Sequence, residues 1–172
     1  MQRVFRNERL PVTLIELVER SADRLQAAGV AFGHGTTNAF DEASWLVLWR
    51  LGLPLCALEQ YAGEDVANVD AARAEALVDE RIRSRRPAAY LTGEAWLQGV
   101  PFYVDERVIV PRSLIAEPLA EATLDTWLSD QTQTVLDLCT GNGSLAVLAA
   151  MAWAQVSLDA ADLSADALAV AR

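Results

Sequence analysis

The stretch Val135-Leu136-Asp137-Leu138-Cys139-Thr140-Gly141-Asn142-Gly143-Ser144-Leu145-Ala146 decides the fold of this chain. Its apolar first residues, Val135, Leu136 and Leu138, are typical of a parallel strand that is covered on both faces. The two glycines allow the backbone to turn sharply and to approach a ligand closely. The apolar run that follows predicts a helix whose N-terminal amides face the loop. A strand, a glycine loop and a helix N-terminus together predict a nucleotide-type binding site.

Composition and charge are those of a folded acidic protein. The 172 residues, 52% of them hydrophobic, are enough for one ordinary domain or two small ones. The formal net charge is -10, and all 14 lysine-plus-arginine positions are arginines, which argues against a general nucleic-acid binder. This charge is compatible with a basic protein partner, although many acidic proteins use net charge only for solubility.

The sequence lacks signals for membrane insertion and secretion, which narrows the expected cellular compartment. No apolar run reaches the roughly 18 residues that a membrane span needs. Residues 1–6 lack the apolar core of a secretory signal. Cys56 and Cys139 are far apart in apolar surroundings, which predicts buried free thiols in a reducing compartment. We therefore expect a cytoplasmic protein that binds neither membrane nor nucleic acid directly.

Metal chemistry is not expected from this sequence. His34 is the only histidine, and it lies in the turn-rich segment 32–38. No cluster of cysteine, histidine and carboxylate residues has the spacing of metal ligands. His34 is therefore predicted to be a structural or surface residue of a loop.

The first half of the chain predicts a bundle of helices. Thr13 and Glu16 resemble a capping box at the start of the first one. The second has Asn38 or Asp41 as its expected cap and Gly52 as its expected end. It is apolar on nearly all sides, which predicts a central position in the core. Asp70 is the expected cap of the fourth. Apolar residues at helical spacing define these segments, which are 11–29, 41–51, a short one from residue 54, and 70–85.

Arginines gather at the end of the fourth predicted helix, at Arg81, Arg83, Arg85 and Arg86. Positive charge at a helix C-terminus complements the helix dipole, and this is the expected role of the group. A site for a phosphate or an acidic partner is the alternative.

The sequence pattern changes at Pro87. Residues 87–112 predict a hairpin linker, with β segments at 94–97 and 101–104 joined by Gln98-Gly99, and a further extended piece at 108–110. A helix is predicted over 113–128, with its regular part starting near Glu117 and Pro118 in its first turn. The remaining predicted elements are strands over 134–139 and 156–161, a helix over 145–153, and a helix capped by Ser164.

Two kinds of ligand fit the glycine loop. Residues 141–146 match the dinucleotide pattern G-x-G-x-x-[GA], and Asp162 lies about where a ribose-binding acid is expected. This match leaves a nicotinamide-dependent oxidoreductase open. Asp137, however, stands four residues before Gly141, where a dehydrogenase strand normally stays apolar. A carboxylate there suits a ligand with positive charge near the loop, such as the ammonium and sulfonium groups of S-adenosylmethionine.

The second acid has two possible roles. The carboxylate of Asp162 could accept hydrogen bonds from both ribose hydroxyls. The alternative is that Asp137 only caps a turn and Asp162 only caps a helix. Two acids at the ends of adjacent predicted parallel strands, on either side of a glycine loop, favour the ligand-binding interpretation.

Motifs outside the loop add a resemblance that covers nearly the whole chain. With these motifs, in this order and spacing, the chain resembles the protein-glutamine methyltransferases that modify translation proteins. The motifs are Tyr90-Leu91-Thr92-Gly93, Phe102-Tyr103-Val104, Val110-Pro111-Arg112-Ser113 and Asp137-Leu138-Cys139-Thr140-Gly141-Asn142-Gly143.

Further short sequence motifs are similar to those of one branch of this family, which methylates a glutamine of the third large-subunit ribosomal protein. Cys139 stands where the release-factor branch has a glycine. These motifs are Gly33-His34-Gly35-Thr36, Asp41-Glu42-Ala43, Tyr103-Val104-Asp105-Glu106-Arg107-Val108 and Pro111-Arg112-Ser113.

The resemblance implies an α/β chain in three parts. These are an N-terminal helical bundle for substrate recognition over 1–86, a β-hairpin linker over 87–112, and the start of a Rossmann-like S-adenosylmethionine-dependent methyltransferase domain over 113–172. It implies that Asp137 lies near the amino group of the cofactor and that Asp162 holds its ribose. Arg112 and Glu117 are expected close to the site. The residues expected around the methionine part are Cys139, Thr140, Gly141, Asn142 and Gly143.

The family's acceptor-binding motif, Asn-Pro-Pro-Tyr, does not occur in the sequence. That motif grips the glutamine amide and aims its nitrogen at the methyl group. An amide nitrogen is a poor nucleophile, so positioning and electrostatics must supply much of the catalysis. We therefore expect a truncated chain that is inactive alone, and we name no catalytic residue in it.

The implied function is methyl transfer from S-adenosylmethionine to a glutamine side chain of a large-subunit ribosomal protein. The same chemistry on a peptide-chain release factor is the first alternative. Two others come from different classes. One is the nicotinamide-dependent oxidoreductase, and the other is a non-catalytic module whose helical domain docks a ribosomal protein.

Overall fold

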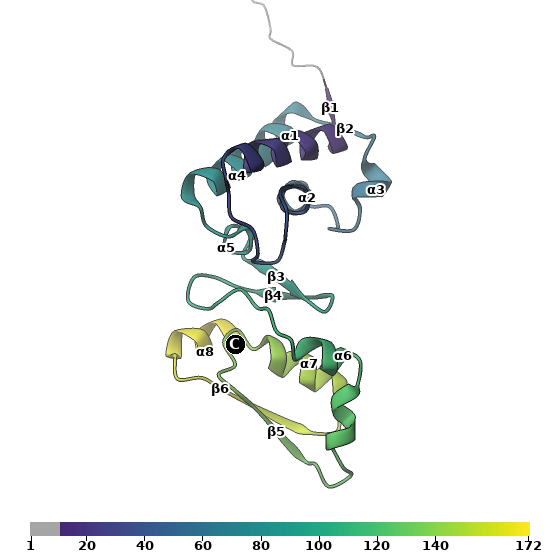
Figure 1. Cartoon of the computed structure of the whole chain (residues 1–172), viewed down its shortest axis with the longest axis vertical. Coiled ribbons are helices and arrows are strands. Elements are labelled where there is room, and N and C mark those ends of the chain that lie inside the picture. Colours follow the sequence, from purple (N-terminus) through teal and green to yellow (C-terminus); the bar gives the residue numbers. More distant parts are fainter. Residues whose placement is uncertain (1–10) are drawn as a thin grey trace, which may run out of the picture. The chain divides into compact units, whose positions relative to one another are not determined.

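The computed structural model describes residues 11–172, which divide into two compact units between Ala88 and Ala89. Within that range the chain is a mixed α/β structure whose strands form three two-stranded sheets (Figure 1). Among the described residues, no helix is long and apolar enough to cross a membrane. The expectation that residues 1–6 carry no signal lies outside the described range.

The first unit is built from helices and one small antiparallel sheet. Helix α2 packs against both α1 and α4. The short third helix starts later than predicted, because Pro54-Leu55-Cys56-Ala57 forms a turn before it. The elements are β1 (Val12–Thr13), α1 (Leu14–Ala27), α2 (Ala39–Leu51), α3 (Leu58–Tyr61), β2 (Asp65–Val66) and α4 (Asn68–Ser84).

Local signals set the ends of α1 and α2, although α1 is shorter than the predicted 11–29 and α2 begins two residues before the predicted Asp41. The Thr13 N–H donates to Glu16 Oε2 at 3.0 Å, and the Glu16 N–H donates to Thr13 Oγ1 at 3.4 Å, which completes the capping box. Asn38 caps α2 by accepting from the Asp41 N–H at 2.9 Å. Gly52 ends α2 in the left-handed conformation with φ 69°. The central position of α2 is confirmed, since its residues 45–48 are all buried.

The start of α4 and its arginines differ from the prediction. The helix begins at Asn68 and is capped by Ala67 without a side-chain bond, so Asp70 lies in the first turn. Arg81 does not lie on the surface near the helix end. It is 3% exposed, and its guanidinium donates to Glu42 Oε1 at 2.7 Å and to the Ala31 carbonyl at 2.9 Å.

Glu42, 2% exposed, completes this buried network by accepting from Thr36 Oγ1 at 2.9 Å. The network ties α2, α4 and the loop between α1 and α2 together. Removing one partner of a buried ion pair leaves the other charge uncompensated, which costs far more than the intact pair contributes. Helical spacing places Arg81 on the buried face of α4, together with Ala71 and Val78, but no local pattern identifies Glu42 as its partner.

We expect Arg81→Met to lower the free energy of unfolding by about 3–5 kcal/mol, because Glu42 is left charged and buried. Urea denaturation followed by tryptophan fluorescence measures this change in the free energy of unfolding. Arg83→Met, on the exposed side of α4, is the matched control and should stay within about 0.5 kcal/mol of the wild type. The double variant Glu42→Gln/Arg81→Met should recover part of the loss. A loss below about 1 kcal/mol in Arg81→Met would contradict a structural role for the pair.

The second unit starts with a short helix and a hairpin. Helix α5 (Ala88–Thr92), which begins at the boundary between the units, was not predicted. Strands β3 (Glu94–Leu97) and β4 (Val100–Tyr103) pair antiparallel as predicted, with Glu94 opposite Tyr103. Gln98 and Gly99 both have positive φ, as a two-residue hairpin turn of type I′ requires. Residues 108–110 form no strand.

The helix predicted over 113–128 is broken in two. Helix α6 (Ala116–Ala120) contains Pro118 in its first turn, as predicted. Ala122 then takes the left-handed conformation with φ 57°, and the 3-10 helix η1 (Thr123–Trp127) follows. Within η1, Asp125 accepts a hydrogen bond from Trp153 Nε1 at 2.7 Å. The helix is therefore interrupted at Ala122 next to a segment that bonds to a distant residue, and local helix propensity does not predict this interruption.

The last part of the chain is a parallel β-α-β-α segment. It consists of β5 (Thr134–Leu138), α7 (Ser144–Ala152), β6 (Ser157–Ala161) and α8 (Ala165–Ala171), close to the predicted bounds. Ser164 caps α8 by accepting from the Ala167 N–H at 3.1 Å. Figure 1 shows α6 and α7 on one side of the β5–β6 sheet. The buried core on that side consists of Phe102, Ala116, Leu119, Leu148, Ala149 and Trp153.

The prediction that the first strand is covered on both faces is wrong for the described residues. Val135 packs against the core, but Leu136 and Leu138 are 60% and 70% exposed. A continuous apolar run has the same sequence whether one or both faces are covered, so the run alone does not distinguish the two cases.

Candidate functional site

The glycine loop leaves β5 through a run of left-handed residues. Cys139 has φ 64°, Gly141 has φ 58° and Gly143 has φ 81°. Between them, Thr140 continues the strand pairing by donating its N–H to the Ala161 carbonyl at 3.0 Å. The Gly143 N–H then donates to the Thr140 carbonyl at 2.9 Å and closes the turn before α7. Cys139 pays a conformational cost in this turn, because a residue with a Cβ disfavours positive φ.

Asp137 is oriented by the loop that follows it. Thr140, which is 6% exposed, donates its hydroxyl to Asp137 Oδ2 at 2.6 Å. The other carboxylate oxygen, Oδ1, accepts no further hydrogen bond from the described residues. Asp137 is half-buried, and one side of its carboxylate is therefore fixed while the other can accept from a ligand.

Asp162, directly after β6, holds the loop from the neighbouring strand. Its Oδ2 accepts from the Gly141 N–H at 2.9 Å, and its Oδ1 accepts from the Ser164 N–H at 2.9 Å. These backbone donors, Ser164 first and Gly141 second, lower the pKa of the Asp162 carboxyl below its ordinary value. Each oxygen keeps a lone pair for a further donor.

Asn142 connects the loop to the hairpin. Its Nδ2 donates to the Tyr103 carbonyl of β4 at 3.3 Å, and its Oδ1 accepts from the Ser144 N–H at 3.3 Å. Both polar atoms of the side chain thus bond to this chain itself. The φ of 81° favours glycine at position 143, where an added Cβ would come into contact with the Cβ of Ala171 in α8, at 3.4 Å.

One cavity, of about 130 Å³, brings most of the predicted site residues together. Asp137, Arg112 and the loop residues 139–142 all line it. Gly143 and Asp162 do not line it, although Asp162 is bonded to Gly141. Glu117 does not line it either and is exposed on α6. The lining residues are Ile109, Pro111, Arg112, Ser113, Asp137, Cys139, Thr140, Gly141, Asn142, Ser144 and Leu145.

The second wall of the cavity is formed by Ile109, Pro111, Arg112 and Ser113, and the segment directly before it has a structural role that the sequence did not show. Residues 104–108 are tied down by Asp105, whose carboxylate accepts from the Tyr103 hydroxyl at 2.9 Å and from the Arg107 backbone and guanidinium at 2.6–3.1 Å. The Arg107 guanidinium lowers the pKa of Asp105. The Tyr90 hydroxyl donates to the Val108 carbonyl at 2.6 Å, and burial raises its pKa. These residues belong to the motifs that carry the family resemblance, and only that resemblance singled them out in the sequence.

The prediction that the cysteines are buried is wrong, because Cys56 and Cys139 are both exposed free thiols. Cys56 lies in the turn before α3, and Cys139 lies on the loop and lines the cavity. Apolar neighbours in sequence do not bury a residue that stands in a turn. His34 is exposed in its loop, as predicted. Residues 11–172 contain no group of three His, Cys, Asp or Glu side chains that could hold a metal ion.

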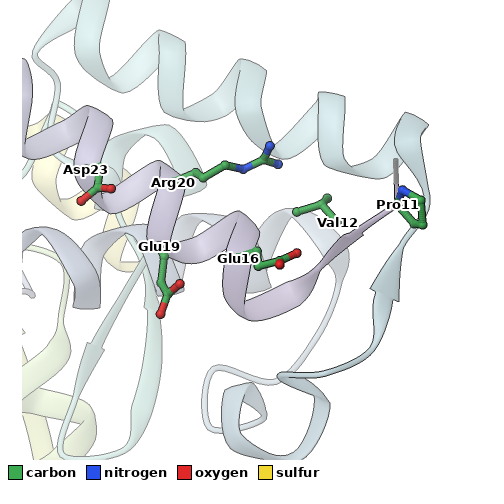
Figure 2. Close-up of a pocket in the computed structure, with 6 residues that line it drawn as sticks. All are labelled: Pro11, Val12, Glu16, Glu19, Arg20 and Asp23. Atoms are coloured by element: carbon green, nitrogen blue, oxygen red, sulfur yellow. The ribbon is translucent and has the colours of Figure 1, made fainter. Parts of the chain in front are cut away.

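A larger cavity, of about 470 Å³, lies along α1 in the first unit (Figure 2). Figure 2 shows Glu19 and Asp23 reaching from α1, with Arg20 pointing away from them. Arg20 forms an ion pair with Glu75 of α4 at 3.5 Å, and Glu16 belongs to the capping box. None of the predicted site residues lines this cavity.

The sequence is similar to several curated methyltransferases. Ribosomal protein uL3 glutamine methyltransferase of Bordetella pertussis is 51% identical over 161 residues, which are 92% of this chain and 54% of the relative. The protein of the same name from Burkholderia pseudomallei is 51% identical over 162 residues, and that from Neisseria meningitidis serogroup B is 42% identical over 161 residues. No protein-family model matches the chain.

The chain is a homologue of part of these methyltransferases. It spans about half the length of the curated relatives that it matches. Because the match extends over more than nine-tenths of this chain, it includes both the helical unit and the glycine loop. The family resemblance inferred from the motifs is thus confirmed.

Gly141→Ala tests the conformation of the loop. We expect it to lower the free energy of unfolding of the second unit by about 1 kcal/mol, because φ 58° disfavours a Cβ. The added Cβ meets no atom within 4 Å, so the effect is conformational rather than steric. Gly63→Ala is the matched control, since it also has open space but no positive φ, and it should be neutral or stabilising. Thermal denaturation measures the change in stability that each variant causes. Equal changes for Gly141→Ala and Gly63→Ala would contradict the left-handed conformation of Gly141.

The lowered pKa of Asp162 predicts a pH dependence. A carboxyl whose folded-state pKa is lowered contributes stability that is present above the unfolded pKa, ordinarily 3.8, and is lost as the pH falls through the folded value. The wild type should therefore lose stability as the pH falls below about 4, and Asp162→Asn should lose less over the same window. Urea denaturation between pH 3 and 7 measures this. Asp159→Asn, exposed on β6, should keep the wild-type profile, and an identical profile for Asp162→Asn would contradict the two backbone bonds.

Proposed function

We propose that this chain carries the S-adenosylmethionine-binding part of a protein-glutamine methyltransferase that acts on ribosomal protein uL3. The observation that carries the proposal is the cavity in which the loop residues 139–142, Asp137 and Arg112 meet. The names of the relatives support the reaction and the acceptor. A protein with this function works in the cytoplasm, where ribosomal proteins are made.

The donor set of the cavity fits this cofactor. Oδ1 of Asp137 can accept from the α-ammonium group, since Thr140 occupies only Oδ2. Gly141 lines the cavity, and a Cβ there would project into open space that a ligand can use. The remaining lone pairs of Asp162 can accept from the ribose hydroxyls. Cys139, Thr140, Gly141, Asn142 and Gly143 would surround the methionine part, with Asn142 and Gly143 acting through loop geometry.

When bound, S-adenosylmethionine supplies a methyl group on a sulfonium that a nucleophile can displace. The residues of this chain bind and orient that donor. Fixed geometry accounts for much of such catalysis, because the reacting groups must meet in line. The sequence contains no Asn-Pro-Pro-Tyr, so we assign no acceptor-binding or catalytic residue within these 172 residues.

We further propose roles for the two units. The helical first unit recognises the acceptor protein. The segment β5-α7-β6-α8 is the start of a Rossmann-like domain, because its parallel strands are joined through a helix and the loop follows the first strand. The hairpin β3–β4 links the two parts and contributes Phe102 to the core of the second unit.

Calorimetry decides between this cofactor and a nicotinamide. We expect the chain to bind S-adenosylhomocysteine and not NAD, because Asp137 opposes an anionic pyrophosphate near the loop and favours an ammonium group. Asp137→Asn should weaken S-adenosylhomocysteine binding about tenfold, since a charged hydrogen bond is lost. Asp159→Asn, on the exposed face of β6, is the control and should bind like the wild type. Binding of NAD alone would overturn the proposal in favour of an oxidoreductase.

The acceptor is tested with the complete protein that the gene encodes. Given uL3 and a peptide-chain release factor in equal amounts with labelled S-adenosylmethionine, it should methylate a glutamine of uL3, as mass spectrometry of the products would show. Methylation of the release factor instead would replace uL3 as the acceptor and leave the chemistry unchanged. Methyl transfer by these 172 residues alone would show that the acceptor is held without Asn-Pro-Pro-Tyr.

A further inference from the structure

Arg112 is the one cation that lines the cavity beside the glycine loop, among the described residues. It follows Pro111, is exposed, and makes no hydrogen bond or ion pair with the described part of the chain. Residues 89–172 contain only two other arginines, Arg107 and Arg172, and no lysine. Arg107 is held by Asp105, so Arg112 is the guanidinium that this cavity leaves available to a ligand.

The segment that leads to Arg112 is anchored directly after the hairpin. Tyr90 of α5 holds Val108 through its hydroxyl, and Asp105 holds Arg107. Pro111 restricts the backbone directly before Arg112. The backbone that leads to this arginine is therefore held by the fold, although its side chain has no partner among the described residues. An anchored arginine without a protein partner suits recognition of an anion, because its planar fork pairs with a carboxylate through two parallel bonds.

We infer that Arg112 binds the carboxylate of the α-amino acid part of the cofactor, while Asp137 binds its ammonium group. The inference rests on the proposed function, since it names the residue that recognises one group of the proposed ligand. A cavity lined by one free cation and one oriented carboxylate matches a zwitterion, which carries one charge of each sign. Arg112 thereby makes the site selective for the intact amino acid over a ligand that keeps the ammonium and lacks the carboxylate.

Two ligands that differ only in the carboxylate test the inference by calorimetry. These are S-adenosylhomocysteine and its decarboxylated analogue, in which an aminopropyl group replaces the amino acid. The wild-type chain should bind S-adenosylhomocysteine about tenfold more tightly than the analogue, as expected for one charged pair at an exposed site. Arg112→Gln should weaken only S-adenosylhomocysteine and bring the ratio close to one.

Two further variants serve as controls. Arg112→Lys keeps the charge but not the planar fork, so it should retain part of the preference. Arg50→Gln removes another exposed arginine, at the end of α2 in the first unit, and should leave the ratio unchanged. Circular dichroism checks that each variant is folded, which is expected because the Arg112 side chain bonds to no described residue.

The outcomes separate this inference from the proposed function. If Arg112→Gln binds S-adenosylhomocysteine with the wild-type preference, Arg112 does not recognise the carboxylate, and the proposed cofactor still stands. If the folded wild-type chain binds both ligands equally, the inference falls in the same way. If the folded wild-type chain binds neither ligand, the proposed cofactor fails, and the inference fails with it.

Discussion

The bond between the Asp162 carboxylate and the Gly141 N–H is the constraint on which the candidate site depends. Asp162 stands at the end of β6, and Gly141 follows β5, so this single contact fixes the loop against the neighbouring strand. The Thr140 N–H, bonded to Ala161, adds a second tie at the same edge. With the loop fixed, Thr140 can orient Asp137 and Asn142 can reach the hairpin. Pairing of two parallel strands thus determines the shape of the loop wall of the cavity.

Short-range signals in the sequence predicted the ends of most elements. The capping box at Thr13, the glycine after α2, the turn at Gln98-Gly99 and the cap at Ser164 each act within a few residues, so the local sequence contains all that determines them. The loop residues of the site were predicted for the same reason. The positive φ of Gly141 and Gly143 and the position of the loop between a strand and a helix follow from the local pattern of glycines, whereas the positive φ of Cys139 does not.

Features that depend on distant residues were missed or wrong. The buried Arg81 forms an ion pair with Glu42, which lies 39 positions earlier in the chain, and no local pattern reveals such a partner. The break at Ala122 accompanies a bond between Asp125 and Trp153, and the exposure of Leu136 depends on which elements cover the sheet. The anchoring of the second wall by Tyr90 and Asp105 also joins residues across loops, so only the resemblance pointed to these positions.

The left-handed conformation of Gly143 has an evolutionary consequence. The second glycine of the motif is favoured by its own φ of 81° at the start of α7, and it does not line the cavity. Natural selection for folding alone would therefore preserve this glycine in a descendant that had lost its ligand. A glycine pattern found in such a sequence would record the ancestry of the fold, whereas the charged pair Asp137 and Arg112 would be free to drift.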